Sequence, residues 1–313
     1  MLKQEFTFEG SNRKPYTLNG VLWTPENKEV DRIIHVFHGM TEHIGRYEIF
    51  AEAMTKQGIA VAGFDLRGHG KNLGDPDCAS FGEGGWACAL EDMEIFSNML
   101  YGKYPAAKHY VLGFSLGSFL LREYLMQEND NKISGAIIMG TGDQPAMILK
   151  AIIAVVKGEI KKAGWDQTTP LVQSLSFETY NKKFKPNRTH SDWLCSDENE
   201  LDSYIGDHLC RKDISAGLFA DLLASMERTG EKKAYAKYRK DLPILLISGI
   251  EDSVGNFGKG VQTVYTQMKK NGVQDIQIKL YEGARHDLLH EEASGVANQV
   301  REMIAGWILE HGN

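Results

Sequence analysis

The chain has 313 residues, of which 42% are hydrophobic and 25% charged, and its net charge at pH 7 is −7. This is the composition of a folded globular protein, and a chain of this length can bury a stable core without metals or disulfide bonds. The negative charge argues against a dedicated nucleic-acid-binding protein, which needs a concentrated basic surface.

The cysteines and the apolar segments indicate a cytoplasmic protein. None of the four cysteines belongs to a CxxC pair, so the sequence predicts neither a zinc ribbon nor a disulfide scaffold, although a bridge between Cys195 and Cys210 stays open. The first residues contain no apolar run of the signal-peptide type. The most apolar stretch, 146–156, is interrupted by Lys150 and falls short of the roughly 20 residues that span a bilayer.

Strands and helices alternate along most of the chain. Short apolar, β-branched runs predict strands, and the turn signals among the first three indicate a hairpin or a sheet edge. This alternation predicts an α/β protein with a mostly parallel sheet and helices on both faces. The expected strands are 5–10, 17–24, 32–39, 59–66, 109–115, 132–140, 243–249 and 276–283, and the expected helices lie near 45–57, 85–101, 116–129, 256–271 and 294–311.

The alternation stops between about Asp143 and Lys240. That stretch is rich in charge and in helical patterns and has no convincing run of strands. It is too long for a loop between two strands, so we expect an inserted helical cap at 143–240 and a core formed by 1–142 and 241–313.

Residues 113–117 read GFSLG, between a predicted strand and a predicted helix. In this G-x-S-x-G context the serine stands on a tight turn, where side chains at Gly113 and Gly117 would clash. The turn lifts the Ser115 hydroxyl above the sheet at a helix N-terminus, which favours developing negative charge. Ser115 is therefore the predicted nucleophile.

A serine hydroxyl needs a base and an orienting acid to become a good nucleophile. In this arrangement they follow in the order serine, acid, histidine, at the ends of later strands. Asp252 follows strand 243–249 and His286 follows strand 276–283, so we predict a Ser115–His286–Asp252 triad. Glu251 and Asp143 remain alternative acids.

The spacing of His286 and His290 also raises the question of a zinc site. The metalloprotease pattern requires Glu directly after the first histidine, where Asp287 stands, and no third ligand is apparent. We therefore predict no metal, and we expect His290 to be a helix-surface or capping residue beside Glu291.

The loop after strand 32–39 is expected to form part of the oxyanion hole. Two backbone N–H groups must point at the oxygen that becomes negative. Leu116, directly after the nucleophile, and Met40 are the candidates. Gly39 would allow close approach to substrate, while His38 either contacts substrate or braces the loop.

The segments HGMTEHIGRY, FDLRGHGKN, GFSLGS, GIEDSVGN and GARHDLLHE together resemble the monoacylglycerol lipase and lysophospholipase-like branch of the α/β-hydrolases, which is related to the serine aminopeptidases. The resemblance covers about 30–142 and 240–311. It implies the α/β-hydrolase fold, the same triad and oxyanion residues, and no cofactor. It is much less specific for the substrate, and Asp287 stands where the family often has Glu.

The expected function is a serine carboxylic-ester hydrolase acting on a monoacyl lipid, either a monoacylglycerol or a lysophospholipid. One alternative is an aminopeptidase of the proline iminopeptidase type. It would need carboxylates of the cap to hold an ammonium group, and the acidic run Asp197, Glu198, Glu200 and Asp202 could supply them. Another is a non-catalytic binding protein, which would lack a triad member, and none is missing.

A predicted helix in the cap, 146–165, has one apolar face and a second face with lysines. The apolar face either packs on the core or rests on an anionic lipid surface, and the two interpretations are compatible. Packing on the core is the favoured interpretation, transient contact with the inner membrane surface is compatible with it, and the oligomeric state is not predicted. The apolar face is formed by Leu149, Ile152, Ile153, Val156 and Ile160, and the lysines are Lys150, Lys157 and Lys161.

Overall fold

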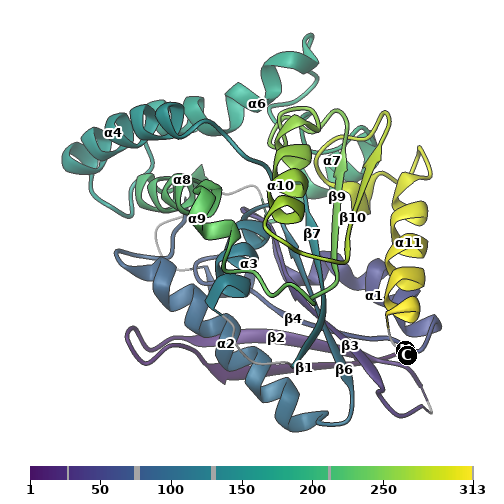
Figure 1. Cartoon of the computed structure of the whole chain (residues 1–313). Coiled ribbons are helices and arrows are strands. Elements are labelled where there is room, and N and C mark those ends of the chain that lie inside the picture. The colour runs from purple at the N-terminus through teal and green to yellow at the C-terminus, as the bar shows by residue number, and fades with distance from the viewer. Residues whose placement is uncertain (27, 74–77, 128–131, 211–212, 312–313) are drawn as a thin grey trace.

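The computed structural model describes residues 1–26, 28–73, 78–127, 132–210 and 213–311 (Figure 1). At its centre lies an eight-stranded sheet with the order β1-β2-β4-β3-β6-β7-β9-β10. β2 is antiparallel to β1 and β4, and the other neighbours are parallel. The strands are β1 Leu2–Glu9, β2 Thr17–Thr24, β3 Arg32–Phe37, β4 Ala60–Phe64, β6 Lys108–Phe114, β7 Ile133–Met139, β9 Ile244–Gly249 and β10 Ile276–Tyr281.

Helices cover both faces of this sheet, as the alternation of elements predicts. Because successive side chains of a strand point to opposite faces, Ile33 packs in one core layer and Ile34 in the other. The first layer includes α2 Gly85–Lys103, α3 Leu116–Gln127 and α10 Lys259–Lys270, and the second includes α1 Glu48–Lys56 and α11 Val296–Glu310. The predicted α/β fold class is confirmed.

We call residues 143–240 the cap, and it stands between β7 and β9 in the chain (Figure 1). α4 and α8 pack on each other, and α8 also packs on α3 of the core. The helices of this segment are α4 Ala146–Ala163, α5 Pro170–Gln173, α6 Thr179–Asn181, α7 Glu198–Gly206, α8 Ala216–Gly230 and α9 Lys232–Tyr235.

The cap also contains a two-residue strand, β8 Asp213–Ile214, which pairs with β5 Cys78–Ala79 of the core. Two residues are too few to leave a strand pattern, so the sequence does not predict this pair. Cys195 and Cys210 are free and do not form the bridge that the sequence left open. In the described part of the chain, the helices are too short or too polar to cross a membrane.

Candidate active site

Ser115 stands between β6 and α3 in a left-handed backbone conformation, with φ of 50°. Its N–H donates to Met139 O of β7 at 3.0 Å, which fixes the turn to the sheet. A Cβ atom on Gly117 would lie 2.0 Å from Phe37 O, and one on Gly113 would lie 2.4 Å from Gly117 O. The two glycines are therefore required by close backbone packing, for the reason that the motif predicts.

The loops after β9 and β10 bring Asp252 and His286 together. His286 Nδ1 lies 2.9 Å from Asp252 Oδ1, and the two side chains are 1% and 0% exposed. Ser248 Oγ donates to Asp252 Oδ2 at 3.0 Å and the Val254 N–H donates to Oδ1 at 2.8 Å, so the carboxylate is held from both sides. The imidazole is turned out of good hydrogen-bond alignment with Asp252, and its Nε2 has no partner among the described residues.

The two rival acids lie elsewhere. Glu251 is exposed, and its N–H donates to Ala284 O at 3.0 Å. Asp143 stands near buried Arg122, and burial raises the pKa of its carboxyl. Among the described acids, only Asp252 lies within 4.0 Å of the ring of His286.

The expectation for His290 is wrong. This residue is buried in the short 3-10 helix Leu288–His290, and its Nδ1 lies 2.8 Å from Asp287 Oδ1. The chain leaves β10 through a turn at Gly283, with φ of 70°, and the short helix that follows turns His290 inward onto Asp287 instead of toward solvent. His286 and His290 therefore bind different carboxylates.

The predicted oxyanion residues lie on either side of the serine turn. Leu116 is the first residue of α3, where backbone N–H groups have no partner inside the helix. Met40, in the loop after β3, lines the same cavity as Ser115 and His286. A Cβ atom on Gly39 would lie 2.9 Å from Glu42 Oε1 and 3.0 Å from Phe114, so its close approach is to protein atoms.

His38 braces this loop. Its Nδ1 lies 2.7 Å from Gly39 O, and its Nε2 accepts the Leu66 N–H at 2.9 Å. Burial lowers the pKa of the fully buried ring to about 3, so the ring is neutral at physiological pH. Both ring nitrogens are therefore used by the backbone, and of the two roles expected for His38 the structure shows the bracing one.

A cavity of about 30 Å³ lies over Ser115, with room for only about two water molecules. Its lining is almost entirely apolar and comes from both the core and the cap. The cap therefore closes over the serine in this structure. The cap residues that line it are Ser176, Phe177, Tyr180, Trp193, Leu194, Phe219, Leu222 and Met226.

The sequence pattern assigns these cap residues no role at Ser115. The aromatic residues Phe177, Tyr180 and Trp193 stand close together in the chain, and that clustering is the one signal that could have drawn attention to them. It does not reveal which core residue they cover.

The acidic run proposed for an ammonium group does not line this cavity. Asp197 is buried and caps α7 by accepting the Asn199 and Glu200 N–H groups. Asp202 is exposed and pairs with Arg188 at 2.7 Å. The structure thus brings none of these carboxylates to Ser115.

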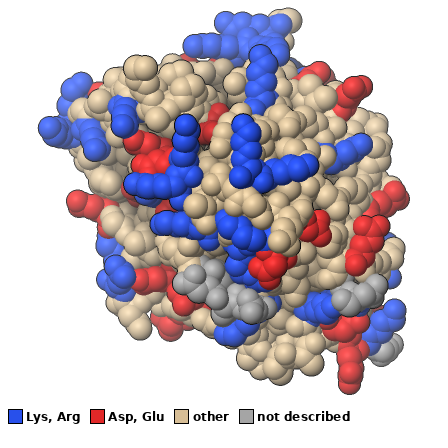
Figure 2. Space-filling view, viewed as in Figure 1, with Lys and Arg blue, Asp and Glu red and all other residues tan. Residues whose placement is uncertain are grey.

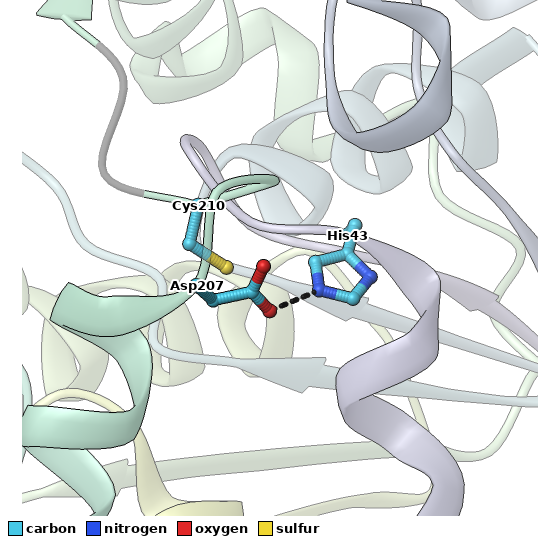
Figure 3. Close-up of side chains that lie close together, drawn as sticks. All are labelled: His43, Asp207 and Cys210. Atoms are coloured by element: carbon cyan, nitrogen blue, oxygen red, sulfur yellow. Dashed lines mark hydrogen bonds and ion pairs between the residues drawn. The ribbon is translucent and has the colours of Figure 1, made fainter.

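Among the described residues, His43, Asp207 and Cys210 are the one group whose metal-ligating atoms converge, all within 4.8 Å of one another (Figure 3). His43 Nδ1 accepts the Gly45 N–H at 3.1 Å, so the ring proton is on Nε2, which lies 2.8 Å from Asp207 Oδ2. Burial raises the pKa of the Cys210 thiol, which opposes the thiolate form that binds metals. The group fits a hydrogen-bonded link between core and cap rather than a metal site.

A search against protein families matches residues 28–293 to the serine aminopeptidase S33 family. Among curated proteins, the rat monoglyceride lipase is 27% identical over 291 residues, which is 91% of this chain and 84% of that protein.

Two solved structures show the same fold. The carboxyl esterase from Bacillus coagulans, in complex with glycerol, has a TM-score of 0.87 at 23% identity and covers 100% of both chains. A soluble variant of the monoglyceride lipase from Saccharomyces cerevisiae, bound to a substrate analogue, has a TM-score of 0.73 at 20% identity and covers 98% of this chain and 94% of that one.

Proposed function

Because the chain belongs to the serine aminopeptidase S33 family of the α/β-hydrolases, and within it to the monoacylglycerol lipase branch, we propose that it is a serine carboxylic-ester hydrolase that cleaves monoacyl lipids. The single observation that carries the proposal is the meeting of Ser115, His286 and an apolar lining in one cavity, with Asp252 2.9 Å from the imidazole.

The reaction would begin with attack of Ser115 Oγ on the ester carbonyl carbon while His286 Nε2 takes the hydroxyl proton. Asp252 holds the imidazole in the tautomer with its proton on Nδ1 and stabilises the imidazolium that forms. His286 then gives the proton to the leaving alcohol, and the acyl group stays on Ser115. A water molecule activated by His286 releases the fatty acid.

The oxyanion of each tetrahedral intermediate would be held by the N–H groups of Leu116 and Met40. The N-terminus of α3 adds the positive end of its helix dipole at the same place. Gly39 supports the loop, since its own N–H donates to Glu42 Oε1 at 2.5 Å and keeps Met40 beside the cavity.

A second cavity of about 190 Å³ borders the first and supports a neutral alcohol as the leaving group. Phe177, Trp193 and Leu194 line both cavities. The second cavity is also lined by Glu178 and Asp213, whose negative charge would disfavour the phosphate of a lysophospholipid. A monoacylglycerol therefore fits this site better.

Entry of an acyl chain requires the cap to move, because the cavity over Ser115 is much smaller than a lipid tail. α4 offers a surface for that event. Its buried face is Leu149, Ile153 and Val156, while Met147, Ile148 and Val155 are 83%, 51% and 46% exposed. Figure 2 shows Lys and Arg side chains bordering this part of the cap. We propose that the exposed apolar side chains of α4, Met147, Ile148 and Val155, rest with the neighbouring lysines on an anionic membrane surface.

The test compares hydrolysis of a monoacylglycerol, a lysophospholipid and an amino-terminal proline amide by the purified protein, with Ser115→Ala as the blank. Monoacylglycerol cleavage that falls by at least about 10⁴-fold in the variant is the expected result. Full activity in Ser115→Ala would overturn the proposed site. Cleavage of the proline amide alone would overturn the proposed substrate class.

A further inference from the structure

The loop that carries His286 is bound along its length to residues 192–197 of the cap, which we call the strap. The Asp287 N–H, directly after the histidine, donates to Leu194 O at 2.7 Å. Directly before the histidine, Arg285 Nη1 donates to two strap carbonyls, those of Asp192 at 2.6 Å and Cys195 at 3.0 Å. The strap therefore holds His286 on both sides in the chain.

The contact continues beyond the histidine through side chains that are mostly buried. Glu291 is 0% exposed and Asp197 is 6% exposed, so these bonds are shielded from water. The strap is thus fixed to the core, although it belongs to the cap in the chain. The further bonds join Cys195 Sγ to His290 O at 3.0 Å, Ser196 N to Glu291 Oε1 at 3.0 Å, and Ala293 N to Asp197 Oδ2 at 2.8 Å.

The strap places the ring of Trp193 against the imidazole of His286. The ring centroids are 5.2 Å apart with an interplanar angle of 36°. Trp193 is 6% exposed, and its ring also packs on Phe177 at 5.9 Å and Tyr180 at 5.2 Å. Phe114 of β6 is the other aromatic contact of the imidazole, at 4.9 Å.

We propose that Trp193 is a positioning residue of the hydrolytic site, which holds the imidazole of His286 and stabilises the imidazolium formed in each chemical step. The inference rests on the proposed function and deepens it. It assigns the strap to the catalytic machinery and leaves the opening movement of the cap to the part that contains α4.

Two physical effects support this role. Close packing of the indole restricts rotation of the imidazole, whose Nδ1 lies 2.9 Å from Asp252 Oδ1 while the two rings are in contact. The indole face also attracts a cation within about 6 Å of its centroid, and Trp does so more strongly than Phe. This second effect acts on the charged imidazolium and not on a neutral imidazole.

The experiment measures kcat and kcat/KM against pH for a soluble short-chain ester, with Trp193→Leu and Trp193→Phe. Leucine keeps an apolar cover but has no aromatic face. We expect kcat to fall about thirtyfold in Trp193→Leu, as for a desolvated cation–π pair, and the acid limb of the kcat/KM profile to move to lower pH. Trp193→Phe should recover part of both effects.

The matched control is Trp165→Leu, because Trp165 is a cap tryptophan that packs at Gly217 and does not line the cavity over Ser115. A second variant, Arg285→Gln, loosens the strap while leaving Trp193 itself intact, and should lower kcat in the same direction. Arg188→Gln, which breaks an exposed pair in the cap, is its control.

The rate at which a fluorophosphonate labels Ser115 distinguishes failure of the positioning role of Trp193 from failure of the proposed hydrolase function. Labelling that slows in Trp193→Leu and Arg285→Gln but not in the controls supports the positioning role. A wild-type protein that is labelled and hydrolyses esters, with pH profiles unchanged in both variants, would overturn it. A wild-type protein that is neither labelled nor active would overturn the proposed function itself.

Discussion

Arg46 joins the loop after β3 to the loop that carries His286: its Nη2 atom lies 2.9 Å from Asp287 Oδ2. Its Nη1 atom contacts Glu42, whose Oε1 accepts the Gly39 N–H at 2.5 Å. The three charged side chains are between 2% and 12% exposed. A buried charge network therefore connects the loop after β3 to the residue next to His286.

Replacing Arg46 by methionine should destabilise the protein strongly. Burial raises the pKa of Asp287, but His290 and Arg46 outweigh burial and hold that pKa well below its ordinary value. Without Arg46 two buried carboxylates lose their common partner, and we expect a loss of about 3 kcal/mol in the free energy of unfolding. Urea denaturation would measure it. Lys56→Gln, which breaks an exposed pair with Glu52, should leave the free energy of unfolding nearly unchanged.

Asp252→Asn should lower kcat by about 10⁴-fold with little effect on folding, since the amide keeps the shape of the carboxylate but favours the wrong imidazole tautomer. Steady-state esterase kinetics would measure this. Glu251→Gln is the matched control, because Glu251 is the exposed neighbour in the chain and a rival acid in the sequence. A large loss in Glu251→Gln together with an active Asp252→Asn would contradict the assignment.

Four buried histidines should make the protein sensitive to mild acid. Burial lowers the pKa values of His35 and His109, whose Nε2 and Nδ1 atoms lie 2.9 Å apart, and it lowers those of His38 and His69 to about 3. Each is neutral when folded and takes up a proton on unfolding once the pH falls below its unfolded pKa, about 6.5. The free energy of unfolding should therefore decrease as pH falls below 6.5, by up to about 1.4 kcal/mol per pH unit for each histidine.

Urea denaturation at several pH values between 5 and 8 tests this sign. His109→Gln should reduce the slope below pH 6.5, whatever its effect on the stability at pH 8. A free energy of unfolding that rises toward pH 5 would show that these rings are protonated in the folded protein.

Gly117→Ala should cost more than about 3 kcal/mol, because the new Cβ would lie 2.0 Å from the backbone oxygen of Phe37 and the turn cannot shift without moving Ser115. Gly306→Ala is the control. It lies in α11 with no atom within 4 Å of the added Cβ, and should stabilise the protein by about 0.5–1 kcal/mol. The melting temperatures of both variants, measured by thermal unfolding, would test these two expected changes in stability. Equal melting temperatures would contradict the packing argument for the motif.

The double variant Met147→Ser with Ile148→Ser should reduce binding to anionic vesicles by at least about tenfold, given the transfer free energy of two apolar side chains. Co-sedimentation with phosphatidylserine-containing vesicles measures this, and hydrolysis of a soluble ester should be unchanged. Leu2→Ser is the control, because Leu2 is 59% exposed on the edge strand β1. Vesicle binding that does not change in the double variant would exclude α4 as the contact surface.

The sequence predicted the structural features that depend on local residue patterns. Short apolar runs predicted the long strands of the core and helical periodicity predicted its long helices, because the spacing of buried side chains follows from backbone geometry. The G-x-S-x-G turn placed Ser115 because only glycine tolerates the contacts at Gly113 and Gly117. The positions of Asp252 and His286 followed from a rule of topology, that side chains at the carboxyl ends of parallel strands share one edge.

The error over His290 and the omission of Trp193 have a common physical cause. Which way His290 faces in its short helix depends on the buried carboxylate of Asp287, and the burial of that carboxylate is a tertiary feature. Likewise, an aromatic residue in a long insertion carries no signal of what it covers, since its neighbours come from distant parts of the chain.

The sequence by itself determined the fold class and the order of the reactive groups, because both follow from local periodicity and from rules of strand connection. Only the tertiary structure decided how the cap meets the core. The hydrogen bonds of the strap to the histidine loop, the packing of Trp193 on His286 and the charge network through Arg46 join segments that lie far apart in the chain. The energies of these contacts depend on distance, burial and orientation, and the order of residues in the chain does not determine these quantities by local pattern alone.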